Sequence, residues 1–456
     1  MLDETISRTE PVKLLHWVWK QRRKSQSVFK DFKTVCVVSG PAGCGKTTSV
    51  LNHFRQNRTF YFSFAGLDEA LAEKLFSECI TGKTGITVSC WDDSLKTAAG
   101  MFEVVILDDL ASLTTYRRFH KAFYAHMFPN KHSRPLAILI EPPSECVKGI
   151  ADNYFEISMG YFSVQEVMKL YPTLPKADIL GLCTVSGGIA AMLKEYDVQL
   201  DFEGNFRNML KPDCGFIKLM PELLRKCFHR PENYHRILCA ITHGNVRMGE
   251  IGKFTGFALN KCDNYLSRLI GYGFVKTEKV MSKRGAEKTV HRITNSYCLI
   301  WHKYIFQEQS AIQLGNQELI DSIVRRVINT EIHDFHLQKA FKLVNERFQY
   351  ELQMSFCTVK NIEYNPQTVQ GDGFEFTFDA IVRYNHKAIF VKVYQDPLEN
   401  VKKEGLLRLR QAISLANSYL DSYIYIFTKR RFSDYAVAAA AKDDILRLVE
   451  VERLKY

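Results

Sequence analysis

Residues 40 to 48 have the composition of a loop that binds phosphate. They read Gly-Pro-Ala-Gly-Cys-Gly-Lys-Thr-Thr, and they fit the pattern GxxxxGK[ST] directly after the apolar run 35–38. Three glycines let backbone amides turn inward around phosphate oxygens, and the next helix offers its positive N-terminal end. Lys46 is the expected positive charge on the β- and γ-phosphates. The predicted nucleotide contacts are Gly40, Pro41, Ala42, Gly43, Cys44, Gly45, Lys46, Thr47 and Thr48.

A second segment, Val-Val-Ile-Leu-Asp-Asp at 104–109, reads as a buried strand that ends in two acids. Asp108 and the Thr47 hydroxyl are the predicted ligands of Mg²⁺. Asp109 is the candidate for polarising an attacking water, which makes it and Lys46 the candidate catalytic residues. A chance glycine-rich turn is the alternative, but the strand context and the second acidic strand disfavour it. The two segments predict binding of ATP with Mg²⁺, while hydrolysis is a separate question.

Composition and charge leave several classes of partner open. The chain of 456 residues is long enough for about three domains, and its apolar share of 46% is ordinary for a globular protein. No apolar run reaches the roughly 18 residues that a membrane span needs. The segment 1–5 carries acids where a secretory signal needs basic and apolar residues, so a cytoplasmic location without a membrane partner is expected. The net charge of +11 permits contact with a polyanion, but solvated lysines explain it equally well.

Twelve cysteines are scattered along the chain without a CxxC pair or a nearby histidine partner. They are expected to be reduced and mostly buried, rather than disulfides or zinc ligands. Cys44, inside the loop, is expected to be accessible to modification when the loop holds no nucleotide.

From residue 35 to 163, apolar segments of strand type alternate with helical patterns, which indicates a parallel sheet covered on both faces. Ligands of such sheets bind at the carboxyl ends of the strands, where the loop and Asp108 both lie. A helical segment precedes the sheet, with apolar residues at 14, 15, 18 and 19. The predicted strands are Val35–Ser39, Thr59–Phe64, Val104–Asp108 and Leu136–Ile140, with helices at Asp68–Ile80 and Tyr116–Met127.

The region after residue 163 changes character twice. Residues 163–210 look wholly helical around Ser186-Gly187-Gly188, which is typical of a small lid over a nucleotide. Residues 234–293 then read as three helices and a basic hairpin, the order of a winged helix-turn-helix. Such a domain binds DNA in some proteins and only packs against protein in others, and both readings stay open. The candidate DNA contacts are Lys261 and Arg268 on the third helix, beside Asn260, Asp263 and Asn264, and Lys283 and Arg284 in the hairpin.

Past residue 310 the pattern is that of a mixed α/β domain. A helix is predicted at Gln317–Val327 and another at Leu337–Gln349. Strands are predicted at Phe374–Val382, Ala388–Tyr394 and Tyr423–Thr428, with a helix at Leu398–Leu420 and a final helix from Asp434.

In this order of parts, the chain resembles a family of archaeal and bacterial ATPases. Members carry an AAA-related module of the lineage allied to signalling (STAND) ATPases, then a winged helix and a restriction-endonuclease-like domain. The likeness is carried by Ile6–Glu10, by Ser186–Ile189 with Ala190 where proline is usual, by Arg292–Trp301, and by Tyr423–Thr428 with Phe432. It implies an α/β P-loop NTPase sheet at 1–162, a helical lid at 163–210, a winged helix at 211–305 and a nuclease-like domain at 306–456.

The nuclease-like domain departs from the pattern of active relatives. These bind metal with an aspartate on one strand and Glu-x-Lys on the next. Here Asp379 and Lys392 are present, but Phe390 stands in place of that glutamate, and Lys342 in place of a helical one. A single carboxylate beside a lysine cannot hold and activate a divalent cation, so this domain is expected to be inactive.

The ATPase module departs as well. Glu141 follows the last predicted core strand, where relatives tend to have a small polar sensor, and no arginine lies near 151–154. Arg117, Arg118 and Arg134 are substitutes without positional support. A missing arginine costs on the order of 10³ or more in phosphoryl transfer, so hydrolysis is expected to be slow or to need a neighbouring subunit.

Three functions are compatible with these patterns. The first is an ATP-binding switch that hydrolyses slowly with Mg²⁺. The second is a protein bound to double-stranded DNA, in which ATP only sets the conformation. The third is an ATP-dependent nuclease that uses a remnant Asp379/Lys392 centre. A protein partner or self-association is compatible with each of them.

Overall fold

The computed structural model describes residues 9–24, 35–109, 116–127, 135–141, 154–281, 287–332, 367–371, 374–384, 387–394, 402–416, 421–428 and 431–450. The chain divides into two compact units. Unit 1 comprises Met1–Pro172 and Leu182–Val324, and unit 2 comprises Thr173–Gly181 and Arg325–Tyr456. The four strands and two helices predicted for the nucleotide core, and the whole loop, belong to unit 1.

Unit 1 contains a parallel sheet of five strands in the order β2-β3-β4-β1-β5. Every residue of its three central strands is buried, which explains their near-continuous apolar sequence. Four strands match the prediction, whereas β5 was not predicted. The strands are β1 (Val35–Ser39), β2 (Thr59–Ser63), β3 (Val104–Asp108), β4 (Leu136–Glu141) and β5 (Phe155–Ser158).

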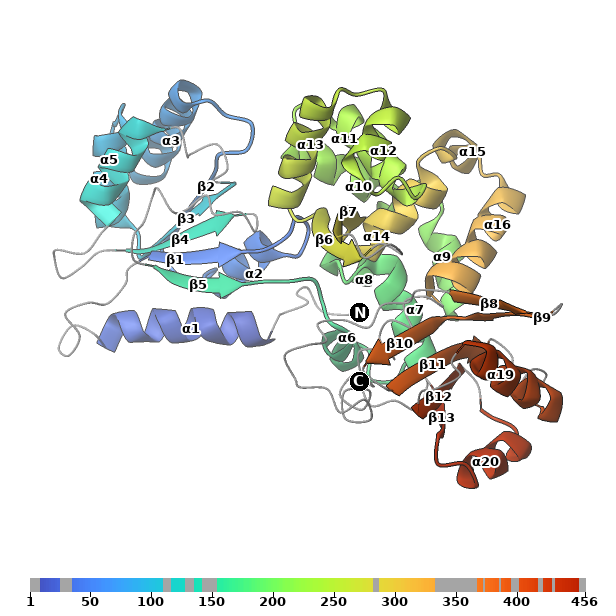
Figure 1. Cartoon of the computed structure of the whole chain (residues 1–456). Helices are drawn as coiled ribbons and strands as arrows, with labels where there is room; N and C mark the ends of the chain where they lie inside the picture. The colour runs from blue at the N-terminus through green and yellow to red at the C-terminus, as the bar shows by residue number, and fades with distance from the viewer. Residues whose placement is uncertain are drawn as a thin grey trace. The chain divides into compact units, whose positions relative to one another are not determined.

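Helices cover both faces of this sheet (Figure 1). Alternate residues of each strand point to opposite faces, so Val35 and Val37 join one core and Cys36 and Val38 the other. The first core is completed by α3 (Glu69–Thr84), α4 (Trp91–Met101) and α5 (Arg117–Met127), and the second by α1 (Thr9–Lys24) and α2 (Lys46–His53). The parallel sheet between two helical layers fits the α/β fold expected of a P-loop NTPase.

Short helices follow the sheet, where the sequence predicts a lid. Gly187 and Gly188 break them with backbone φ angles of 58° and 70°, which favour glycine. The Asn295 side chain donates a hydrogen bond to the Gly187 carbonyl at 2.9 Å. The helices are α6 (Val164–Leu170), α7 (Lys176–Ser186), α8 (Ala190–Leu193), α9 (Phe202–Met209) and α10 (Gly215–Cys227).

Three helices and an antiparallel hairpin come next, at the predicted places. They are α11 (Pro231–Thr242), α12 (Met248–Thr255), α13 (Leu259–Gly271), β6 (Val275–Met281) and β7 (Glu287–Ile293). Phe228, directly after α10, stacks on Tyr234 of α11 with ring centroids 3.7 Å apart. Beyond the hairpin lie α14 (Ser296–Ile300), the π-helix η3 (Trp301–Ile305), α15 (Gln309–Gln313), α16 (Gln317–Val327) and the π-helix η4 (Ile328–Ile332), the last of which belongs to unit 2.

Unit 2 contains a mixed sheet in the order β10-β11-β12-β13, antiparallel between its first two strands and parallel elsewhere. The single strand predicted at 374–382 is wrong, because it breaks at Asp379 into β9, which pairs with β8, and β10, which pairs with β11. The predicted helix at 337–349 lies outside the described residues. The elements are β8 (Gln367–Gly371), β9 (Phe374–Phe378), β10 (Ala380–Tyr384), β11 (Lys387–Tyr394), α19 (Lys403–Ala416), β12 (Asp421–Thr428), α20 (Asp434–Ala441) and β13 (Leu446–Glu450).

Within the described part of the chain, none of the helices is both long enough and apolar enough to span a bilayer.

Candidate nucleotide-binding site

The predicted phosphate-binding loop, residues 40–48, lies between β1 and α2, at the carboxyl ends of the parallel strands. Gly43 and Gly45 adopt φ angles of 79° and 91°, a left-handed backbone that other residues adopt only with strain. A Cβ on Gly40 would come within 2.0 Å of the Met159 carbonyl oxygen. The predicted glycines are therefore required by the loop's own shape.

Lys46 begins α2 and turns back toward the loop. Its ammonium donates hydrogen bonds to the carbonyls of Gly40 at 2.6 Å and Pro41 at 3.0 Å. The positive charge therefore lies beside the loop backbone and the N-terminal end of α2, where a phosphate group is favoured.

Thr47 and Asp108 meet, as the sequence predicts for a magnesium site. The Thr47 hydroxyl donates to Asp108 Oδ2 at 2.6 Å, and the Tyr61 hydroxyl donates to the same oxygen at 3.2 Å. Burial, followed by the neighbouring Asp109 carboxylate, raises the pKa of Asp108. A divalent cation would offset both effects and favour the charged form, and these hard oxygen donors suit Mg²⁺.

Few protein groups are available to complete the shell of such a cation. Among the described residues, no cluster of three or more His, Cys, Asp or Glu side chains is arranged to hold a metal. Magnesium commonly keeps several waters and binds through one or two protein ligands plus substrate phosphates. The Thr47–Asp108 pair fits that mode of binding.

Asp109 has an unusual backbone, with φ at 59°, the only left-handed residue other than glycine in the described ranges. Its backbone N–H donates to Asp108 Oδ1 at 2.8 Å. Its carboxylate oxygen Oδ2 accepts a 2.8 Å hydrogen bond from the Ser63 hydroxyl and lies 3.6 Å from the ammonium of Lys226. The predicted water-polarising group is therefore held by two side chains.

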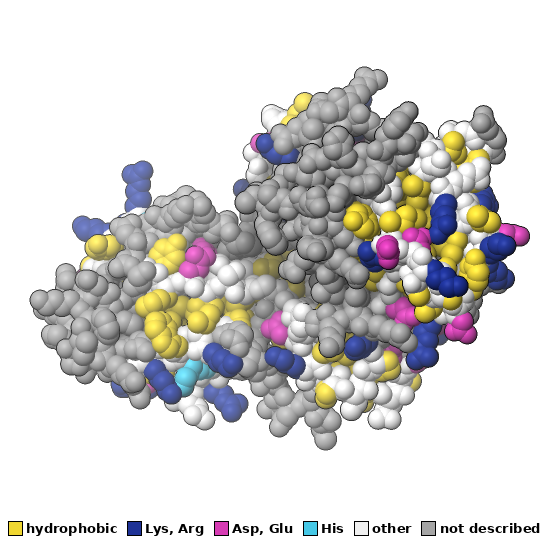
Figure 2. Space-filling view, turned by 60° about the horizontal axis from the view of Figure 1, so that its bottom comes forward, with side chains coloured by type: hydrophobic (Ala, Val, Ile, Leu, Met, Phe, Trp, Pro, Cys, Tyr) yellow, Lys and Arg dark blue, Asp and Glu magenta, His cyan; other side chains and the backbone are white. Residues whose placement is uncertain are grey.

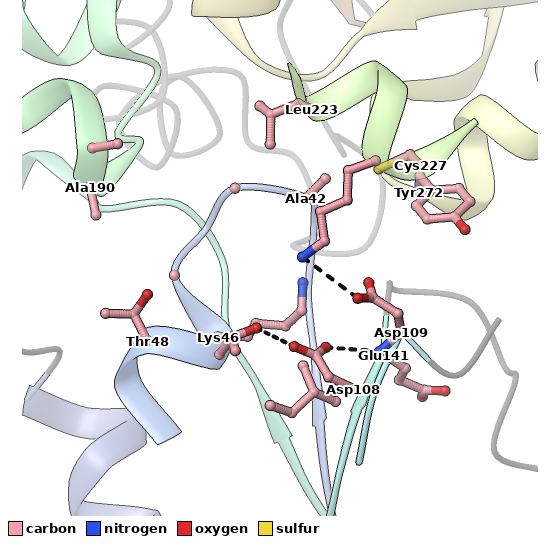
Figure 3. A pocket seen from close by; sticks show the side chains of 16 residues that line it. Ala42, Lys46, Thr48, Asp108, Asp109, Glu141, Ala190, Leu223, Cys227 and Tyr272 are labelled. Carbon is pink, nitrogen blue, oxygen red and sulfur yellow. Dashed lines mark hydrogen bonds and ion pairs between the residues drawn. The ribbon is translucent and has the colours of Figure 1, made fainter. Parts of the chain in front are cut away.

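The loop and the two acids line a cavity of about 280 Å³. Figure 3 shows Leu223, Cys227 and Tyr272 across this cavity from Lys46 and Asp108. These three residues come from α10 and from the end of α13, so the cavity is bounded by both the sheet and the helical part of unit 1. The lining residues are Ala42, Gly43, Gly45, Lys46, Thr47, Thr48, Asp108, Asp109, Ile140, Glu141, Ala190, Ala191, Leu223, Lys226, Cys227 and Tyr272.

Several contributors to this site were missed at the sequence level. Tyr61 and Ser63 alternate along β2, so both point to the face that carries the acids, but polar residues in a strand are not specific signals. Lys226 ends a basic stretch far along the chain, and only the folding of α10 over the loop brings it to Asp109.

The sensor and arginine positions can be partly located. Glu141 is buried at the end of β4 and lines the cavity, so a carboxylate stands where a small polar sensor was expected. Arg118 forms ion pairs with Glu69 and Glu73. Neither Arg117 nor Arg118 lines the cavity, whereas Arg134 and residues 151–153 lie outside the described residues.

The expectation that Cys44 is accessible is wrong for the arrangement described here. Cys44 is fully buried, and its thiol donates to the Met159 carbonyl at 3.3 Å. The Cys44 side chain therefore packs into the protein interior and helps to fix the loop.

The candidate DNA contacts on α13 are exposed at the surface. Lys261 lies over the Phe257 ring at 4.3 Å, and Arg268 approaches the Tyr234 hydroxyl at 3.5 Å. Lys283 and Arg284 lie outside the described residues. On the face drawn in Figure 2, described Lys and Arg side chains are dispersed among acidic and apolar ones.

In unit 2, the predicted remnant pair is brought together. Lys392 Nζ lies 3.3 Å from Asp379 Oδ2 and donates to the Thr377 carbonyl at 2.8 Å. Phe390 is fully buried and contacts Phe378, with ring centroids 5.0 Å apart. The ammonium is therefore paired with the Asp379 carboxylate, and the Phe390 ring packs in the core.

No protein-family model matches the chain. An uncharacterized protein of Methanocaldococcus jannaschii is 26% identical over 248 residues, which are 52% of this chain and 53% of that relative. The chain thus spans about half the length of the curated relative it matches.

Three solved archaeal structures are similar at low identity. The Walker-type ATPase of Pyrococcus abyssi has 14% identity and a TM-score of 0.43, covering 66% of this chain and 96% of that one. The Aeropyrum pernix ORC1 protein in complex with DNA has 12% identity and a TM-score of 0.35, and the match covers 66% of this chain and 93% of that one. A STAND protein with a tetratricopeptide repeat sensor from Pyrococcus horikoshii has 13% identity and a TM-score of 0.26, and the match covers 73% of this chain and 52% of that one. Since all three TM-scores lie below 0.5, function must be derived from the site itself.

Proposed function

We propose that this protein binds ATP with Mg²⁺, hydrolyses it slowly and uses the bound nucleotide as a conformational switch. One observation carries the proposal: the Thr47 hydroxyl and the Asp108 carboxylate meet at 2.6 Å beside the loop that holds Lys46. Two segments remote in sequence thereby form one set of phosphate and cation ligands. A glycine-rich turn without this function would not need the acidic strand beside it.

The protein residues have separate roles in this mechanism. Backbone amides of the loop and the Lys46 ammonium hold the phosphates, and Asp108 with Thr47 holds the cation. Mg²⁺, when bound, neutralises charge on the phosphate oxygens. Asp109 orients the attacking water and accepts its proton.

Slow turnover follows from the surroundings of Asp109 and from the charges available. The Asp109 carboxylate is engaged by Ser63 and Lys226, so it must exchange a partner before it orients water. Among the described residues that line the cavity there is no arginine, which leaves less positive charge to stabilise the transition state.

A switch requires that the nucleotide contacts two parts of the molecule. The cavity is lined by the sheet-side residues Lys46 and Asp108 and by Leu223 and Tyr272 from the helical part. A ligand that fills it has different contacts when these parts are apart, and this difference can drive closure.

The test compares the wild type with Lys46→Ala and Asp109→Asn. Lys46→Ala should weaken binding of a fluorescent ATP analogue by about 10-fold or more, because a charge-assisted phosphate contact is lost. Asp109→Asn should keep binding and lower phosphate release by about 10²-fold. Lys96→Ala, an exposed lysine on α4, is the control. Unchanged affinity in Lys46→Ala would refute the proposal.

Double-stranded DNA is a second candidate ligand, favoured by one feature. The exposed surface of α13 carries Asn260, Lys261, Asn264 and Arg268, side chains that can contact base edges and phosphates. On this proposal, the three helices and hairpin at 211–305 act as a winged helix. The exposed Asp263 on the same surface opposes tight binding.

We further propose that residues 306–456 form an inactive restriction-endonuclease-like domain. The support is the Asp379–Lys392 ion pair together with the buried Phe390. A cation would have to displace the ammonium and would find one carboxylate instead of two or three.

A further inference from the structure

Lys226 lies in the last turn of α10 and carries a positive charge into the nucleotide cavity. Its ammonium is 3.6 Å from Asp109 Oδ2, and about half of its side chain, 53%, is exposed. Figure 3 draws this ion pair as a dashed line at the Asp109 carboxylate. A lysine has a flexible stem and three donors, so its ammonium can exchange one partner for another.

The ion pair is weak enough to be exchanged. The Lys226 side chain is 53% exposed and that of Asp109 is 27% exposed, and such a pair contributes at most about 1 kcal/mol because solvent screens it. Phosphate oxygens carry more charge than one carboxylate and form stronger hydrogen bonds with an ammonium. A phosphate group within reach of Lys226 would therefore compete with Asp109 for it.

The charges that line the cavity favour a second basic side chain beside a bound triphosphate. Its described acidic residues are Asp108, Asp109 and Glu141, and its described basic residues are Lys46 and Lys226. Lys46 contacts the loop at the carbonyls of Gly40 and Pro41, whereas Lys226 stands at the acid that faces the attacking water. Without Lys226, only Lys46 and the proposed Mg²⁺ would offset the charge of the triphosphate beside the three lining carboxylates.

We propose that Lys226 leaves Asp109 and binds the γ-phosphate when ATP enters, and that it stays on Asp109 when ADP is bound. This inference rests on the proposed ATP-binding function. The exchange has two effects. It supplies positive charge that the missing arginine does not, and it frees the Asp109 carboxylate to orient water. ATP thus activates its own hydrolysis, and the ammonium distinguishes the triphosphate from the diphosphate.

The same exchange gives the helical part of unit 1 a way to sense the γ-phosphate. Backbone carbonyls of α10 accept hydrogen bonds from Tyr297 of α14, at 2.7 Å to Phe216, and from Trp301 of η3, at 3.2 Å to Ile217. A displacement of α10 by Lys226 is therefore passed to α14 and η3.

The test measures affinity for ATP and for ADP, together with phosphate release, in Lys226→Met, Lys226→Arg and Lys218→Met. Lys218 is a matched control on the same helix, with 52% of its side chain exposed and an ion pair to Asp213 at 3.5 Å. Lys226→Met should weaken ATP binding by about 10-fold, leave ADP binding within about 2-fold, and slow phosphate release by about 10-fold or more. Lys226→Arg should restore most of the preference for ATP, and Lys218→Met should resemble the wild type.

Two results would overturn the role of Lys226. If Lys226→Met keeps the wild-type ratio of ATP to ADP affinity, Lys226 does not bind the γ-phosphate. Faster phosphate release in Lys226→Met would also overturn the inference, because the lysine would then only restrain Asp109. In both cases a loss of binding in Lys46→Ala shows that the proposed function stands. If the wild-type protein binds no nucleotide, the function itself fails.

Discussion

His235 and His302 form a buried contact between α11 and η3, with Nδ1 of the first 3.0 Å from Nε2 of the second. His302 Nδ1 also lies 2.8 Å from the Cys298 carbonyl, which can only accept, so Nδ1 carries the proton. Nε2 of His302 therefore accepts from His235, and both rings are neutral. Burial lowers the pKa of His235 to about 4, and burial with the neighbouring ring lowers the pKa of His302 to about 3.

We expect these rings to make unit 1 sensitive to acid. The unfolded chain takes up these protons below about pH 6.5, while the folded chain does not until about pH 4. The neutral pair thus contributes its full stabilisation above about pH 6.5. As the pH falls below this value, the free energy of unfolding decreases by up to about 1.4 kcal/mol per pH unit for each ring. The slope of unfolding free energy between pH 7 and pH 5, from urea titrations, measures this.

The control for that experiment is His229→Gln, at an exposed position. His235→Gln with His302→Gln should flatten the slope, whereas the control should keep it. An unchanged slope in the double variant would show that other groups cause the acid sensitivity.

Some residues of the site belong to short sequence patterns, whereas others are brought to the site only by tertiary packing. The loop from Gly40 to Thr48 and the pair Asp108–Asp109 could be named as candidates, because each pattern is contiguous in the sequence. Lys226 and Ser63 were not, since tertiary packing alone brings them to Asp109. The described cysteines are free and mostly buried, as the sequence suggested, although Cys298 Sγ lies 3.6 Å from His302 Nδ1, a histidine neighbour that the sequence analysis overlooked.

At the scale of elements, two glycines with a left-handed backbone lie in different surroundings, Gly188 before α8 and Gly315 between α15 and α16. Gly188 has φ at 70°, and a Cβ there would lie 2.4 Å from the Phe162 carbonyl oxygen. Gly315 has a similar φ of 72° with open space around it. The two positions therefore differ in packing but share their backbone conformation.

Alanine at these positions separates strain from packing. Gly315→Ala should cost about 1–2 kcal/mol, the cost of a left-handed backbone. Gly188→Ala should cost about 1–3 kcal/mol more, because Phe162 must also move. Chemical denaturation of both variants measures the difference. Equal losses would mean that the Phe162 contact relaxes without cost.

The success of predicting elements followed their burial. Strands buried on both faces, such as β1 and β3, were predicted because they are continuously apolar. The short strands β5 and β13 were missed, since buried positions alternate with partly buried or exposed ones and polar residues interrupt their apolar sequence. The break at Asp379 was missed as well, because the chain there changes partner strands, and this depends on pairing that no local pattern records.

At the scale of the whole molecule, nucleic acid binding is the open question. If α13 binds duplex DNA, Lys261→Ala and Arg268→Ala should each weaken binding and each lower the salt dependence, log K against log [salt], by about 1. Lys211→Ala, exposed and outside α13, is the control. Fluorescence anisotropy at several salt concentrations provides the measurement. Equal salt dependence in all variants would remove α13 as the contact.

The proposal that residues 306–456 form an inactive nuclease-like domain leads to an expectation about the full chain. Plasmid incubated with the protein, ATP and Mg²⁺ or Mn²⁺ should remain intact, because Lys392 already pairs with the single carboxylate of Asp379. Gel electrophoresis is the measurement. Cleavage that disappears in Asp379→Ala would contradict the inactive assignment.

The left-handed backbone of Asp109 limits which replacements the protein tolerates there. Asparagine, aspartate and glycine enter this conformation readily, whereas β-branched and bulky residues do so only with strain. In a library of all substitutions at this codon, the replacements that prevent folding would therefore differ from those that only abolish activity. Valine or isoleucine would deplete soluble protein, while asparagine and glycine would yield well-folded but inactive clones.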